Sequence, residues 1–190
     1  MNKEKLSFSE LMKKYAYYVV VFFSLVILTA IITIVGIATT RSNTLPTNSQ
    51  ALVYTSPILN GNILKDYSNT ELQWNKTLGQ WEVHKALDFV ANSGANVYSF
   101  TDGTVEKVYT NQLDGTCVTI KHSDELSTIY KFLDSNLEIK EGDIVKSGQV
   151  IGKVSGNAGV EGEDGSHLHF EVWKNGSSVD PSSYLDISNK

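Results

Sequence analysis

The chain has 190 residues, of which 41% are hydrophobic and 19% are charged, and it contains only 3 prolines. This composition is typical of a globular chain and excludes a disordered or fibrous protein. The charge is divided unevenly, because residues 1–14 carry a net charge of +2 and residues 42–190 carry −8. An acidic body without a basic patch is a poor electrostatic match for nucleic acid, so we expect no nucleic-acid partner.

Residues 15–40 form a run of 26 residues without a charged side chain. Because about 20 apolar residues cross the core of a bilayer, this run predicts a single transmembrane helix. Lys13 and Lys14 before it favour a cytoplasmic N-terminus, and tyrosines at its start suit the membrane interface. A cleaved secretory signal is the alternative, but its apolar core is usually about 7–15 residues long and ends at a clear cleavage site.

These features predict four parts in chain order. Residues 1–14 are expected to be a cytoplasmic tail, residues 15–40 the membrane helix and residues 41–55 a polar stalk. Residues 56–187 are expected to form one domain outside the cytoplasm. The single cysteine, Cys117, excludes an internal disulfide framework in this domain, and we expect it to be a small buried strand residue.

Short β-rich runs follow one another after residue 56, and no stretch beyond residue 41 has convincing helical periodicity. The runs are 96–100, 103–110, 117–122 and 126–133, then two strands around a turn at 146–148, and a hairpin at Asn175-Gly176. The fold class is therefore expected to be all-β and antiparallel. The segment 116–123 is a candidate edge strand for the addition of a partner strand.

Two histidine patterns have the spacing of metal ligands. His84 and Asp88 lie in WEVHKALDF, and His167 and His169 lie in GSHLHFEVW. On a strand, residues two apart point to the same face, so His167 and His169 can enter one cleft while Leu168 and Phe170 anchor the strand in the core. Two histidines and one carboxylate form a recurrent catalytic zinc set, although either pattern alone is more often an ordinary surface feature.

Several segments in order resemble the lysostaphin-type (LytM) zinc metallopeptidases, which cleave peptide bonds in peptidoglycan. They are HKALDF, NVYSFTDGTVEKV, CVTIKHSDELSTIYKFL, IKEGDIVKSGQVIGKV and GSHLHFEVWKNGSSVDP. The resemblance implies a LytM-like domain that binds Zn²⁺ through His84, Asp88 and His169, with His167 as a catalytic acid/base beside the metal. The segment GDIVKSGQVIGKV also resembles lipoyl- and biotinyl-carrier domains, but these lack the histidine motifs.

Two positions depart from the family pattern, of which Ala86, where the family commonly has Gly, is the smaller departure. At the other, the family's Y-x-H-L motif reads Tyr130-Lys131-Phe132-Leu133 here, so that Phe132 replaces a second catalytic histidine. Phenylalanine can neither donate a hydrogen bond to an oxyanion nor carry a proton, and losing one such donor costs about 10²–10³ in rate. Metal binding and efficient hydrolysis are therefore separate expectations.

Features outside the ligand set resemble the stage II sporulation protein Q branch of this family. They are the N-terminal anchor, the pair Trp74 and Trp81 before His84, and the missing histidine at Phe132. The branch implies a forespore membrane protein whose domain projects into the intermembrane space. It implies a role in engulfment and channel assembly through a mother-cell partner of the stage III sporulation protein AH type.

Three functional hypotheses remain at this point. The favoured one is a zinc-bound interaction domain, the second is an active peptidoglycan endopeptidase, and the third is a purely structural zinc site. We expect Trp74 and Trp81 to be core or packing residues in preference to a carbohydrate platform. The acidic run of Glu161, Glu163 and Asp164 is expected to be a solvated loop.

Overall fold

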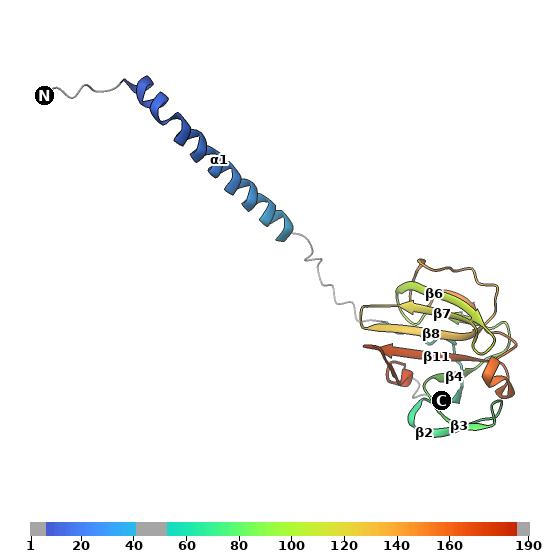
Figure 1. Cartoon of the computed structure of the whole chain (residues 1–190). Coiled ribbons are helices and arrows are strands. Elements are labelled where there is room, and N and C mark those ends of the chain that lie inside the picture. Colours follow the sequence, from blue (N-terminus) through green and yellow to red (C-terminus); the bar gives the residue numbers. More distant parts are fainter. Residues whose placement is uncertain (1–6, 41–52, 186–190) are drawn as a thin grey trace. The chain divides into compact units, whose positions relative to one another are not determined.

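The computed structural model describes residues 7–40 and 53–185, which belong to two compact units that we treat separately. In the first unit, Phe8–Thr40 form the helix α1 of 33 residues (Figure 1). Its segment Lys13–Ala30 is long and apolar enough to cross a membrane. The hydroxyls of Ser24 and Thr29 donate to carbonyl oxygens three residues earlier, at 2.8 and 2.9 Å, which satisfies them within the helix. Much of the predicted tail and stalk lies outside the described residues.

The second unit consists of antiparallel sheets. The main sheet has the order β1-β4-β11-β8-β7-β6-β9, with β12 paired to β11. Figure 1 shows β6, β7, β8, β11 and β4 of this sheet in sequence. Its strands are β1 Ile63–Lys65, β4 Leu87–Val90, β6 Gly103–Asn111, β7 Gly115–Lys121, β8 Leu126–Leu133, β9 Ile144–Val145, β11 His167–Lys174 and β12 Ser177–Val179. Two further sheets pair β2 Ser68–Asn75 with β3 Gln80–His84, and β5 Asn96–Tyr98 with β10 Val150–Lys153. Short 3₁₀ helices cover Gly159–Asp164 and Pro181–Ser183. The prediction of an antiparallel all-β fold is confirmed.

The local turn and strand predictions are also confirmed. Asn175 and Gly176 have positive φ values of 50° and 73°, and Lys174 pairs with Ser177 across them, as in a type I′ hairpin turn. Two strands, β9 and β10, do flank the turn at 146–148. They do not pair with each other, however, because β9 pairs with β6 and β10 pairs with β5.

The prediction that residues 116–123 form an edge strand is wrong. β7 lies inside the main sheet, hydrogen-bonded to β6 on one side and to β8 on the other. Its apolar side chains Cys117, Val118 and Ile120 are fully buried, which suits a central strand. Burial raises the pKa of the Cys117 thiol to about 11, so this cysteine is the expected inert packing residue. The ends of the main sheet are β1 and β9.

The core lies against one face of β11. Leu168, Phe170 and Val172 are fully buried on this face, as the alternation of the strand predicts. The ring of Phe170 lies 5.2 Å from that of Tyr130 and 5.5 Å from that of Phe100, a spacing at which aromatic pairs are stabilising. This aromatic cluster fixes the orientation of β11. The residues that alternate with Leu168, Phe170 and Val172 along the strand therefore point to the opposite face.

One buried hydrogen bond in this core gives a test of the packing. The backbone N–H of Phe100 donates to Tyr130 Oη at 2.8 Å, and both residues are fully buried. We expect Tyr130→Phe to lower the free energy of unfolding by about 1–3 kcal/mol, because it leaves a buried donor unpaired. Urea denaturation measures this change. Tyr98→Phe, at a half-buried strand residue, is the control and should change stability by less than about 0.5 kcal/mol.

Candidate metal centre

Three strands bring the predicted ligands together. β3 ends at His84, β4 carries Asp88, and β11 carries His167 and His169. β4 and β11 are antiparallel neighbours in which His169 is directly opposite Asp88. Opposite residues of an antiparallel pair share one face of the sheet, so these two side chains meet. The strand alternation places His167 on the same face.

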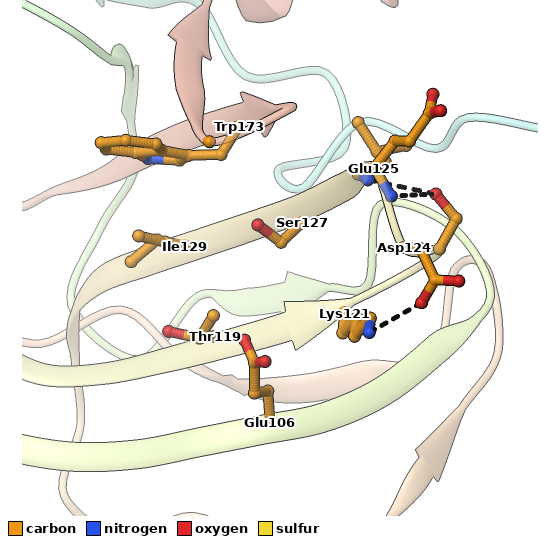
Figure 2. Close-up of a pocket in the computed structure, with 11 residues that line it drawn as sticks. Glu106, Thr119, Lys121, Asp124, Glu125, Ser127, Ile129 and Trp173 are labelled. Carbon is orange, nitrogen blue, oxygen red and sulfur yellow. Dashed lines mark hydrogen bonds and ion pairs between the residues drawn. The ribbon is translucent and has the colours of Figure 1, made fainter.

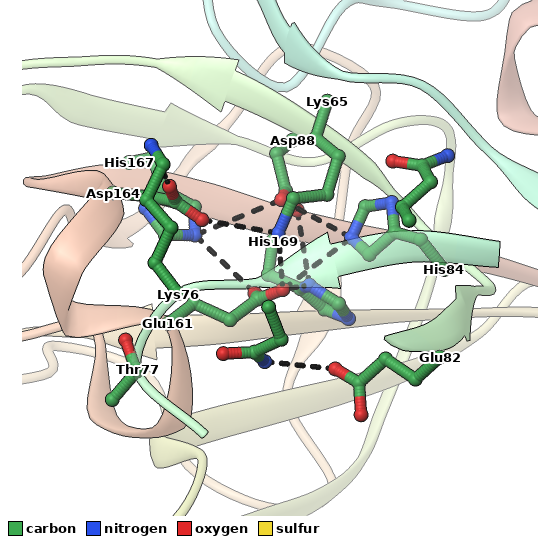
Figure 3. A network of polar contacts seen from close by, with 12 residues as sticks. Lys65, Lys76, Thr77, Glu82, His84, Asp88, Glu161, Asp164, His167 and His169 are labelled. Atoms are coloured by element: carbon green, nitrogen blue, oxygen red, sulfur yellow. Dashed lines mark hydrogen bonds and ion pairs between the residues drawn. The ribbon is translucent and has the colours of Figure 1, made fainter. Parts of the chain in front are cut away.

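The four side chains converge on one small volume (Figure 3). His169 Nδ1 lies 3.0 Å from Asp88 Oδ1, and His84 Nε2 lies 3.1 Å from Asp88 Oδ2. His167 Nε2 lies 3.8 Å from Asp88 Oδ2, beside the other three. A fourth potential ligand, Glu161, is also present, and the ligand atoms of His84, Asp88, Glu161 and His169 all lie within 4.8 Å of one another.

Each of these histidines uses its outer ring nitrogen in a contact with an acceptor. The acceptors are Asp66 O at 2.9 Å from His84 Nδ1, Gly165 O at 2.8 Å from His167 Nδ1, and Glu171 Oε1 at 3.3 Å from His169 Nε2. An outer acceptor of this kind places the proton on the outer nitrogen of a metal-binding histidine and leaves the lone pair of the inner nitrogen free. The three rings are therefore oriented to act as ligands or proton carriers toward the centre.

Three inner atoms of the cluster form no hydrogen bond of good geometry, although His84 Nε2 lies 3.1 Å from Asp88 Oδ2 and His169 Nδ1 lies 3.0 Å from Asp88 Oδ1. In the part of the chain that the structure describes, His84 Nε2, Asp88 Oδ1 and Asp88 Oδ2 are buried without a hydrogen bond. A buried polar atom without a partner costs about 1–3 kcal/mol. A cation bound at their common point would satisfy all three atoms, and two histidines with a carboxylate are a set that zinc prefers. The residues present therefore fit a zinc ion.

Charge in the cluster is balanced between carboxylates and imidazoles. Burial disfavours a charged imidazole, but contacts with Asp88 and Glu161 raise the pKa of His169 well above its ordinary value. Burial also disfavours a charged carboxylate, yet contacts with His169 and His84 hold the pKa of Asp88 below its usual range. The cluster thus favours charged carboxylates with a positive charge between them. A bound cation would supply that positive charge.

Phe132 lies at the edge of this centre. Its side chain is buried, and its ring centroid lies 5.1 Å from that of His167 and 5.7 Å from that of His169. An apolar ring therefore stands where the family resemblance implies a second histidine. The φ angle of Phe132 is 61°, in the left-handed region that is uncommon for a bulky residue and that histidine adopts more readily.

The prediction that Glu161 belongs to a solvated loop is wrong. Its side chain is 4% exposed, and Glu161 Oε2 lies 3.0 Å from His169 Nδ1 and 3.4 Å from His167 Nε2. Only Glu163 of the acidic run is exposed, while Asp164 is paired with Lys65 at 3.1 Å. Local sequence did not show this, because the turn that directs Glu161 inward is determined by contacts with distant strands.

Glu171 is a second residue that the sequence reasoning did not assign. Its carboxylate contacts His169 Nε2 at 3.3 Å and Lys131 Nζ at 2.8 Å, and it accepts a hydrogen bond of 2.6 Å from Trp173 Nε1. Burial favours the protonated acid, but His169 and Lys131 lower the pKa of Glu171 to about 2. The strand alternation that placed His167 and His169 on one face also predicts Glu171 there, so the signal was present.

The tryptophan pair packs outside the core. Trp74 and Trp81 face each other across β2 and β3 with ring centroids 5.5 Å apart. Their side chains are 46% and 62% exposed. The two rings therefore pack on each other, as expected of packing residues, but their exposure shows that they are not core residues.

A polar cleft of about 240 Å³ borders the metal centre. Its lining includes His84, His169, Glu161, Lys131 and Phe132. A hollow of about 420 Å³ lies over β6, β7, β8 and β11, where Lys121 pairs with Asp124 at 2.9 Å (Figure 2). None of the residues that line this hollow belongs to the metal centre, so we assign the chemistry to the smaller cleft.

Comparison with known proteins identifies a matching family and two similar sequences. The model of peptidase family M23 matches residues 82–181, which include all five residues at the centre. The chain is 40% identical over 103 residues to the peptidoglycan DD-endopeptidase ShyC of Vibrio cholerae, covering 54% of this chain and 23% of ShyC. It is 35% identical over 108 residues to stage II sporulation protein Q of Bacillus subtilis, covering 56% of this chain and 38% of that protein. The matched region thus spans less than half of each of these relatives.

Among solved structures, the chain is similar to one described as the SpoIIQ–SpoIIIAH pore-forming complex. The TM-score is 0.61 with 28% sequence identity, over 71% of this chain and 92% of the chain that it matches. The similarity therefore covers nearly the whole of that domain, unlike the matches to the longer relatives.

Proposed function

The chain belongs to peptidase family M23, and from this premise we propose that it is a membrane-anchored, zinc-binding interaction protein of the sporulation type. Helix α1 would anchor it, with the predicted domain at 56–187 outside the cytoplasm, in the intermembrane space around the forespore. Its partner would be a mother-cell membrane protein of the stage III sporulation protein AH type, and its role would be engulfment and channel assembly between the two cells.

One observation carries this proposal. The domain resembles a chain of the SpoIIQ–SpoIIIAH complex over 92% of that chain, and the sequence match to stage II sporulation protein Q supports the same branch. The ends of the main sheet, β1 and β9, are two of the edges at which a partner strand could be added. Ile144 on β9 is 74% exposed, as a residue at such an edge would be before a partner covers it.

The zinc part of the proposal rests on the cluster itself. His84, Asp88 and His169 would hold the ion, and their ligand atoms lie within 4.8 Å of one another. Zinc bound there would supply Lewis acidity toward a peptide carbonyl. His167 Nε2 lies next to the ligands and can hold or pass a proton, since its Nδ1 contacts Gly165 O.

An active peptidoglycan endopeptidase is the second candidate. The polar cleft and the position of His167 favour it, and peptidoglycan would then be the substrate. The buried ring of Phe132 opposes it, because nothing at that position can donate a hydrogen bond to a developing oxyanion. We therefore favour partner binding over hydrolysis as the function of this chain.

Binding of the partner is the direct test. The full chain in detergent micelles is mixed with the soluble ectodomain of the AH-type protein from the same organism, and complex formation is followed by light scattering after size exclusion. We expect a complex with a dissociation constant of about 1 μM or tighter, corresponding to about 8 kcal/mol. An unrelated single-pass ectodomain is the control. The ectodomain is also tested at about 100 μM, which is 100 times the expected dissociation constant. If it binds no better than the control at that concentration, the partner assignment is wrong.

The outer contact of His169 gives a further prediction. Glu171→Ala removes the acceptor at His169 Nε2 but leaves all the proposed ligands in place. We expect zinc affinity to fall by about 10–100-fold, the usual effect of losing such an outer partner. Competition with a chromophoric chelator measures this affinity. Glu125→Ala, at an exposed residue in the turn before β8, is the matched control and should leave the affinity unchanged.

A further inference from the structure

The carboxylate of Glu161 lies among the proposed zinc ligands. Glu161 Oε2 is 3.0 Å from His169 Nδ1, and Glu161 Oε1 is 3.7 Å from His84 Nε2 (Figure 3). Zinc bonds of about 2.0–2.2 Å place the ligands of a tetrahedral ion about 3.3–3.6 Å apart. The two distances lie just below and just above this range, so Glu161 is close enough to be a fourth ligand to the same ion that His84, Asp88 and His169 would hold.

The fold fixes this carboxylate in place. The backbone turns at Glu161, whose φ and ψ of −121° and 19° break the 3₁₀ segment Gly159–Asp164. At the start of the segment, Gly159 has a φ of 48°, and a Cβ atom there would lie 1.9 Å from Leu113 O, so the chain passes against the β6–β7 turn. Only glycine permits this close approach, which holds the start of the 159–164 segment against the β6–β7 turn.

Ion pairs and a hydrogen bond hold the other end of the segment. Asp164 pairs with Lys65 of β1 at 3.1 Å and with Lys76 at 2.7 Å. The backbone N–H of Glu163 donates to Thr77 Oγ1 at 2.9 Å. The segment is thus attached to β1 and to the β2–β3 turn, and Glu161 between these anchors does not move freely out of the centre.

The charges also suit a ligand. Two carboxylates, Asp88 and Glu161, balance the two positive charges of a zinc ion, and two neutral imidazoles complete the set. Lys65 Nζ lies 3.1 Å from Glu161 Oε1 and also contacts Asp164, so its own charge is paired. The buried centre would carry no net charge, which is the condition under which ions are tolerated in a protein interior.

Building on the proposed zinc binding, we infer that Glu161 is a fourth protein ligand that closes the metal centre. Catalytic zinc sites keep one position for water or substrate, whereas structural sites fill all four with protein groups. Glu161 both lines the cleft and contacts the histidines, so it occupies the side from which a small molecule would reach the metal. The chain thereby holds zinc in a site that exogenous ligands cannot enter while the 159–164 segment is in place.

Access of a small anion to the metal tests this inference without relying on activity. The full chain in detergent is loaded with Co²⁺ in place of zinc, and its visible spectrum is followed during titration with azide. We expect no change for the wild type and a saturable change for Glu161→Ala, with azide binding at least about 10-fold tighter than to the wild type. Glu161→Gln, which keeps the shape of the side chain, is a second variant for the case that Glu161→Ala is unstable. Glu163→Ala, at an exposed residue of the same segment, is the control and should behave as the wild type.

The possible outcomes distinguish the role of Glu161 as a fourth ligand from the proposed zinc binding on which it rests. If wild type and Glu161→Ala bind azide equally well, or if neither folded Glu161 variant binds it, Glu161 does not close the site and the inference is wrong. If the wild type takes up neither Co²⁺ nor Zn²⁺, the proposed zinc binding itself fails, and the fourth ligand falls with it. Uptake of the metal with azide binding only in the variants supports both.

Discussion

His169→Ala is expected to lower the affinity of the full chain for zinc by about 10²–10³-fold. Structural zinc sites of four ligands bind with about 10–16 kcal/mol, so one ligand contributes about 2.5–4 kcal/mol. His169 lies 3.0 Å from both Asp88 and Glu161 and has its outer nitrogen against Glu171, so its loss removes a ligand that lies between the two carboxylates. Zinc content by mass spectrometry after dialysis, and competition with a chelator, measure the loss.

The fold should survive this substitution, because the aromatic core lies on the other face of β11. Phe170 and Leu168, on either side of His169, are fully buried there and do not depend on the metal. His122→Ala is the matched control, since that histidine contacts Asp102 O and Thr128 Oγ1 instead of the metal centre. Unchanged zinc affinity in a folded His169→Ala variant would contradict the ligand assignment. Unfolding of His169→Ala but not of His122→Ala would favour the purely structural role for zinc.

The double variant Phe132→His, Glu161→Ala is expected to gain peptidoglycan hydrolysis of about 10²-fold or more over the wild type. Phe132→His places a hydrogen-bond donor beside His167, and one such donor is worth about 10²–10³ in rate. Glu161→Ala opens the metal to the cleft. Hydrolysis needs both an accessible metal and the donor at position 132, so the two changes are coupled and each single variant should gain much less than the double variant.

The backbone should accept this histidine, because the left-handed φ of 61° at position 132 is more favourable for histidine than for phenylalanine. The measurement is the rate at which new amino groups appear in cross-linked peptidoglycan. His84→Ala added to the double variant is the control and should abolish any gain through loss of a ligand. If the folded, zinc-loaded double variant is no faster than the wild type, neither Phe132 nor Glu161 is what limits hydrolysis.

Predictions from sequence succeeded where a residue's role depends on its nearest neighbours. The alternation of His167, Leu168, His169 and Phe170 fixed which side chains share a face, and Asn175-Gly176 fixed a hairpin turn. Predictions from sequence failed where the structure depends on pairing between strands that are far apart in the sequence. The apolar content of 116–123 is equally compatible with an edge or a central strand, and only the pairing of β7 with both β6 and β8 distinguishes them.

Glu161 shows the same limit within the candidate metal centre. An acidic, glycine-rich stretch is usually solvated, and nothing local indicates that one of its carboxylates is buried. Its position depends on Leu113, Lys65 and Lys76, which are remote in sequence. Glu171, by contrast, follows His169 at the same strand spacing and could have been assigned from the alternation alone.

We propose that this chain binds zinc without hydrolysing peptidoglycan, and one measurement tests this most directly. The zinc-loaded full chain and its His84→Ala variant are incubated with cross-linked peptidoglycan from the same organism, and the muropeptides are quantified by mass spectrometry. We predict zinc bound to the wild type, a zinc affinity about 10²–10³-fold lower in the variant, and no difference in cross-linked muropeptides between them. Loss of cross-links with the wild type, absent with His84→Ala, would contradict this proposal and establish the chain as an active endopeptidase.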